Sequence, residues 1–66
     1  MAFVKVKSVD SIYEDIINTN TICQICKGKK RGTYSVYFSN DRSYPEVYDE
    51  SEAKKIFEAI GVSLNW

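Results

Sequence analysis

The stretch Thr33-Tyr34-Ser35-Val36-Tyr37-Phe38-Ser39 decides the fold that this sequence predicts. It is rich in β-branched and aromatic residues, which favour β-strands. Successive side chains of a strand point to opposite faces, so Tyr34, Val36 and Phe38 share one face while Tyr37 belongs to the other. The runs before and after this stretch also have strand character. We therefore expect residues 33–39 to form the centre of a small antiparallel sheet.

The length and composition predict one small domain that covers residues 1–66. A chain of this size buries only about 60% of the surface that it exposes when unfolded, and small folds often gain stability from a second subunit. No apolar run is long enough to span a membrane, and the start has no signal-peptide pattern. We expect a cytoplasmic protein without membrane contact.

The charges balance overall but are unevenly spread along the chain. Residues 1–33 hold six Lys/Arg and three Asp/Glu, whereas residues 34–66 hold three Lys/Arg and six Asp/Glu, so the halves carry +3 and −3. This pattern disfavours both a strongly basic nucleic-acid binder and an acidic mimic of DNA. It favours self-association into a homo-oligomer.

Three further strands are predicted before the central one. Residues 3–9 alternate with Val4 and Val6 on one face, and residues 12–17 form a less regular run in which a helix is an alternative. The polar segment 18–21 predicts a tight turn. In the strand 22–26, strict alternation places Cys23 and Ile25 on one face and Ile22, Gln24 and Cys26 on the other.

A turn at residues 40–43, a short strand at 44–48 and a helix are predicted after the central strand. Pro45 cannot donate a backbone hydrogen bond and therefore marks a sheet edge or a bulge. Asp49 and Glu52 have the spacing of a capping box at a helix N-terminus, and Gly61 is a natural residue just beyond a helix C-terminus. One apolar stripe joins Ala53, Ile56, Phe57 and Ile60.

These elements predict the α+β class: a small antiparallel β-meander of four to five strands with one C-terminal helix packed on one face.

Three segments carry a resemblance to known proteins: Phe3-Val4-Lys5-Val6, Ile17-Asn18-Thr19-Asn20-Thr21-Ile22, and Val47-x-Asp49-Glu50-Ser51 leading into a short helix. Their order over most of the chain resembles very small bacterial proteins of the flagellar FlbD/SwrD type. The central loop is longer and more basic here, and Asn40-Asp41 stands where that family has Asn-Gly. The resemblance implies a similar small fold and a non-enzymatic protein.

The spacing Cys23-Gln24-Ile25-Cys26 is that of one zinc knuckle. A structural zinc site needs four ligands, and this chain supplies two thiols and no His, so zinc would require a dimer. A redox pair or a disulfide is another alternative. We expect two reduced strand cysteines, with no metal and no cofactor.

The segment Lys27-Gly28-Lys29-Lys30-Arg31-Gly32 is the densest charge run, and a glycine at each end suits a hairpin. Such a loop can serve as a solvated tip or contact an acidic partner. Exposed tyrosines supply large, stiff contact areas with a polar tip. The predicted partner-binding residues are Lys29, Lys30, Arg31, Tyr34, Tyr37, Tyr44 and Trp66.

Catalysis is not expected, because the acidic residues cluster at a helix N-terminus or point to opposite sides of a strand. The sequence therefore predicts a small intracellular interaction or regulatory protein that binds a larger protein partner, itself, or both. An adaptor or an inhibitor borne by a phage or plasmid would have this character. The alternative is a module for RNA or single-stranded nucleic acid that uses loop 27–32 and the tyrosines near it.

Overall fold

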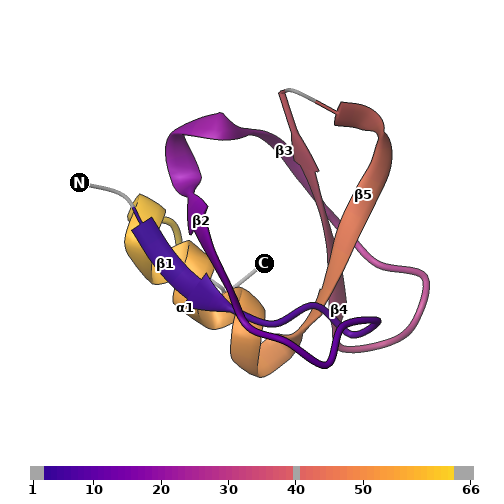
Figure 1. The fold of residues 1–66 in the computed structure, drawn as a ribbon. Coiled ribbons are helices and arrows are strands. Elements are labelled where there is room, and N and C mark those ends of the chain that lie inside the picture. Colours follow the sequence, from indigo (N-terminus) through magenta and orange to yellow (C-terminus); the bar gives the residue numbers. More distant parts are fainter. Residues whose placement is uncertain (1–2, 40, 64–66) are drawn as a thin grey trace.

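The computed structural model describes residues 3–39 and 41–63 and shows an α+β fold, as the sequence predicts. Strand β1 pairs with β2, and β3, β4 and β5 form a second sheet in that order, with every pairing antiparallel (Figure 1). The elements are β1 (Phe3–Val6), β2 (Asp15–Asn18), the 3₁₀ turn η1 (Thr19–Thr21), β3 (Ile22–Lys27), β4 (Thr33–Phe38), β5 (Asp41–Asp49) and α1 (Glu50–Ile60).

The five strands divide between two sheets because the polar turn η1 redirects the chain after β2. The Asn18 side chain accepts a hydrogen bond from the Asn20 N–H at 3.0 Å, and the Thr21 hydroxyl donates to the Asn18 carbonyl at 2.7 Å. Short polar side chains that bind nearby backbone groups compete with ladder hydrogen bonds in this way. The tight turn at residues 18–21 is thus confirmed, but it separates β2 from β3 instead of pairing them as a hairpin.

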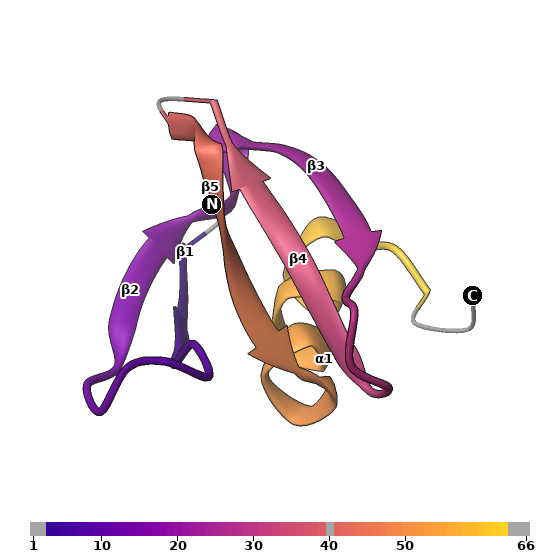
Figure 2. The same ribbon diagram turned by 90° about the vertical axis from the view of Figure 1, so that its right-hand side faces the viewer.

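The core lies between the inner face of β3–β5, the helix and the β1–β2 hairpin. Strand β4 is the central strand of its sheet, and Val36 on its inner face is only 1% exposed. Helix α1 lies against this face, behind β4 in Figure 2. The buried apolar residues are Val6, Val36, Tyr48, Ala53, Ile56 and Phe57.

Both ends of α1 are capped at the residues that the sequence predicts, but only the Asp49 half of the predicted capping box is present among the described residues. The Asp49 carboxylate accepts from the Glu52 N–H at 3.1 Å, and Gly61 adopts the left-handed conformation with φ 78°. The Val62 N–H then donates to the Phe57 carbonyl at 3.0 Å, which completes a Schellman motif. Glu52 has a second, long-range role, because its Oε1 accepts a hydrogen bond from the Lys7 N–H at 2.9 Å. The helix start is thereby tied to the end of β1.

A bulge in β3 makes the faces of that strand differ from the predicted ones. Ile22 pairs with Phe38 and Gln24 with Tyr37, so Cys23 is an extra residue that shifts the alternation. Ile22 and Ile25 both pack against the core as a result. The prediction that Ile22 shares a face with Gln24 and Cys26 was therefore wrong.

Three strand boundaries differ from the sequence prediction by more than one residue. Strand β1 ends at Val6 instead of residue 9. Strand β2 begins at Asp15 because the Ser11 hydroxyl accepts from the Tyr13 N–H at 3.0 Å, which keeps residues 11–13 out of the ladder. Strand β5 begins at Asp41 instead of residue 44, so it occupies most of the predicted turn. Pro45 lies in this strand, which is an edge of its sheet, next to a register shift opposite Val36 and Phe38. The edge-or-bulge prediction for Pro45 is confirmed.

Candidate binding surface

The basic loop between β3 and β4 is a closed hairpin. The Gly28 N–H donates to the Thr33 carbonyl at 2.8 Å, and the Thr33 hydroxyl donates to the Lys30 carbonyl at 2.6 Å. A Cβ atom at Gly28 would overlap the Thr33 side chain, and Gly32 has a φ of 80°. Both glycines are therefore needed, the first for close approach and the second for its backbone conformation.

The four cations of this loop are exposed and form no ion pair with a described side chain. Among the described side chains, those of residues 3–39 and 44–63, the ion pairs join Lys5 to Glu14 at 3.8 Å and Lys55 to Glu52 at 3.3 Å, and neither involves the loop. Glu50 lines the same depression as the loop residues but forms no ion pair with them. The loop thus presents a local positive potential to solvent.

Two loop lysines border an open depression on the face of β3–β5 that points away from α1. Tyr37 and Val47 belong to its lining, and its volume is about 560 Å³. The turn after β1 reaches this place because the Val9 N–H donates to the Val47 carbonyl at 2.8 Å. We call this surface the outer face; its lining comprises Val9, Asp10, Lys29, Lys30, Thr33, Ser35, Tyr37, Pro45 and Val47.

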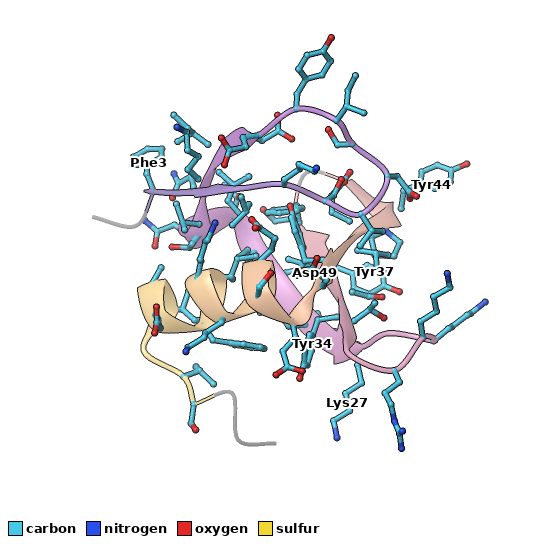
Figure 3. All side chains as sticks on the ribbon, turned by 90° about the horizontal axis from the view of Figure 1, so that it is seen from below. Phe3, Lys27, Tyr34, Tyr37, Tyr44 and Asp49 are labelled. Atoms are coloured by element: carbon cyan, nitrogen blue, oxygen red, sulfur yellow. The ribbon has the colours of Figure 1, made fainter. Side chains whose placement is uncertain are left out.

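The predicted binding residues do not all gather on the outer face. Lys29, Lys30 and Tyr37 do, whereas Tyr34 turns to the inner side and packs edge-on against Phe57 with ring centroids 5.5 Å apart. Figure 3 shows Tyr34, Tyr37 and Tyr44 well separated from one another. Tyr44 is 76% exposed but lines a different hollow, between β2 and β5.

Arg31 and Trp66 are the remaining predicted binding residues. Arg31 lies on the loop and lines the depression beneath it, together with Tyr34. Tyr48 is buried at 2% exposure because it packs in the core with α1. Trp66 lies outside the described residues.

Cys23 and Cys26 do not form one pair of neighbouring ligands. Because of the bulge, Cys23 lines a groove beside α1, while Cys26 pairs with Ser35 on the opposite side of the sheet. The Gln24 amide donates to the Cys26 sulfur at 3.2 Å. Both cysteines are free thiols, and the described residues contain no group of three or more potential metal ligands. The expectation of two reduced cysteines without metal stays a prediction, and an intersubunit zinc site stays its alternative.

The carboxylates at the start of α1 stabilise the helix. The Glu52 N–H and then the Ser51 hydroxyl bind the Asp49 carboxylate, and these bonds lower its pKa. Glu52 itself accepts hydrogen bonds from Lys7 and Lys55. These two groups therefore cap the helix and connect it to the segment after β1.

The sequence did not predict that the turn at residues 9–10 and strand β5 contribute to the outer face. Val9, Asp10, Pro45 and Val47 are brought together by one backbone hydrogen bond between distant segments. Nothing local in the sequence marks that contact.

Comparisons with known protein families, with curated proteins and with solved structures found no match to this chain. No helix within the described ranges 3–39 and 41–63 has the length and apolar character needed to cross a membrane.

Proposed function

We propose that this chain is a small intracellular, non-enzymatic binding protein that docks on a larger protein through its outer face. An adaptor or an inhibitor would act in this way. The supporting observation is the juxtaposition of Lys29 and Lys30 with Tyr37 and Val47 around one open depression. A partly apolar floor with charged groups at the rim is the usual anatomy of a protein interface.

The charge of the rim indicates the chemistry of the partner. The loop cations have no ion-pair partner among the described side chains, so a partner with Asp or Glu residues around an apolar or aromatic side chain would complement them. Complementary charge raises the association rate and fixes the orientation of docking.

Single-stranded nucleic acid is the second candidate, because Lys27, Lys29, Lys30 and Arg31 are close together and exposed. Binders of this class stack successive bases on several aromatic rings. On the outer face Tyr37 is the aromatic residue beside the lysines, since Tyr34 packs on Phe57. This arrangement favours a protein partner.

A pull-down from cell lysate with tagged protein, run with and without nuclease, tests the proposal. We expect a discrete protein band that survives nuclease and is lost in the variant Lys29→Glu/Lys30→Glu. The control Lys5→Glu/Lys54→Glu changes the net charge equally at exposed positions remote from the depression and should retain the band. Recovery of nucleic acid, or a band that disappears with nuclease, would favour the second candidate. Retention of the band by the loop variant would contradict the assigned surface.

A further inference from the structure

The two edges of the three-stranded sheet are protected very differently. On β5, Pro45 has no N–H to offer, and the turn after β1 covers part of the edge through the hydrogen bond from Val9 to Val47. On β3, residues 22–26 carry neither a charge nor a proline. Among the described strands β4 is the partner of β3, and no strand lies beyond β3 in Figure 2. An uncharged edge of this kind is a template for pairing with another strand.

An apolar groove continues this edge towards the end of α1. Its volume is about 450 Å³, and Ile25 and Phe57 form part of its wall. Ile60 is 36% exposed and Val62 is 52% exposed at its margin. The groove is lined by Ile22, Cys23, Gln24, Ile25, Phe57, Ile60, Val62 and Ser63. A strand added to β3 would cover apolar surface as well as backbone groups.

Opposite charges lie at the two ends of the same edge. Strand β3 ends at Lys27, where the basic loop begins. The first residues of β3 share the groove with the last turn of α1, which contains Glu58 and no basic residue. The negative end of the helix macrodipole adds partial negative charge there. One end of the edge is therefore positive and the other negative.

We propose that β3 pairs antiparallel with β3 of a second copy of this chain, about a two-fold axis at Ile25. An antiparallel pair brings the positive end of each edge to the negative end of the other. A second copy therefore complements the charge at both ends of the edge. It also joins two three-stranded sheets into one continuous sheet. Isologous contacts of this type close as dimers and do not propagate.

The faces of β3 restrict the register of the pairing. Residues opposite each other in an antiparallel pair point to the same side of the sheet. With the axis at Ile25, this residue meets Ile25 of the second copy on the inner side, and Gln24 lies opposite Cys26 on the outer side. Cys23 lies opposite Lys27, which brings each Lys27 to the groove beside the other copy's helix end.

The first test is the mass of the tag-free protein in solution by sedimentation equilibrium. We expect a dimer at tens of micromolar, and a monomer under these conditions would overturn the proposal.

Two variants of opposite charge at one position then test the register. Cys23→Lys puts a cation opposite Lys27 of the second copy, so the dimer dissociation constant should rise at least about tenfold, because the two-fold axis repeats the repulsion. Cys23→Glu puts an anion at the same place and should keep the dimer, as should the neutral control Cys23→Ser. Equal weakening by the lysine and glutamate variants would overturn the proposed pairing.

Cross-linking provides a second, independent readout. In a Cys23→Ser background, Gln24→Cys places a thiol opposite Cys26 of the second copy, and a mild oxidant such as oxidised glutathione should yield a covalent dimer on a non-reducing gel. The control Glu46→Cys in the same background puts the new thiol on β5 and should cross-link far less. Similar cross-linking by both variants, or none by either, would contradict the pairing. The loop variant Lys29→Glu/Lys30→Glu should remain dimeric, so this inference and the proposed function can fail separately.

Discussion

The two faces of the three-stranded sheet come from the same strands but differ in what covers them. On the inner face Val36 and Tyr48 are at most 2% exposed beneath α1. On the outer face Ser35, Tyr37 and Val47 border an open depression. These residues alternate along β4 and β5, so a single step along the chain moves from the core to the candidate binding surface. The comparison predicts that inner substitutions change the free energy of unfolding and that outer substitutions change binding.

The largest effect is expected for Ile56→Ala, because Ile56 is 1% exposed at the centre of the core. Truncation of a buried isoleucine to alanine costs about 2–5 kcal/mol, and a domain of this size has roughly 3–10 kcal/mol in total. Urea unfolding followed by circular dichroism measures the loss. Ser35→Ala on the outer face is the control and should stay within about 0.5 kcal/mol of the parent. Similar losses for both variants would remove the distinction between the faces.

A pH-dependent effect is expected at Tyr48, also on the inner face. Burial, followed by the carboxylates of Glu46, Asp15 and Glu52, raises the pKa of Tyr48 to about 12. The unfolded chain ionises this tyrosine near pH 10, whereas the folded chain resists ionisation up to about pH 12. The free energy of unfolding should therefore be retained below pH 10 and fall as the pH rises towards 12.

The variant Tyr48→Phe isolates this contribution from the other tyrosines. Thermal unfolding of the variant between pH 9 and pH 11.5 should show a smaller fall in the midpoint than the parent shows. Parallel curves for the two proteins would mean that Tyr48 ionises as readily in the folded state as in the unfolded chain.

A smaller effect is expected at the junction of β5 and α1. Asp49→Ala removes the carboxylate that accepts from the Glu52 N–H, and loss of such a cap costs about 0.5–2 kcal/mol. The bonds from Glu52 and Ser51 lower the pKa of Asp49, so its contribution is present above the unfolded pKa and is lost as the pH falls through the folded pKa. Urea unfolding at neutral and acidic pH measures both. The stability difference between parent and variant should shrink on acidification, and a difference that is constant with pH would contradict the assignment.

The smallest change in stability is expected for Lys29→Glu/Lys30→Glu. Both side chains are exposed and make no ion pair with a described residue, so unfolding should shift by less than about 0.5 kcal/mol. The same variant should lose its partner in the pull-down. A large loss of stability would show that the loop supports the fold and would remove the contrast between the faces.

The parts of the fold that local chemistry determines could be predicted from the sequence. Asp49, Glu52 and Gly61 define the helix ends through neighbouring backbone groups, and the inner residues of β4 follow from simple alternation. The bulge at Cys23 could not be predicted, because it depends on how β3 aligns with β4.

The candidate site could be predicted only in part. The exposed loop lysines and Tyr37 follow from charge and alternation, and the structure brings them together. The packing of Tyr34 against Phe57 and the recruitment of Val9 to β5 depend on contacts between segments far apart in the chain. Side-chain periodicity within one segment contains no information about such contacts.

The packing of β1 against α1 has a consequence for how the chain folds during its synthesis. Val6 of β1 packs in the same core as Ile56 of α1, which is made 50 residues later. At ordinary rates of translation this interval is roughly 3–10 s. The apolar side of the first hairpin cannot be covered by α1 during this interval, because the helix has not yet been made.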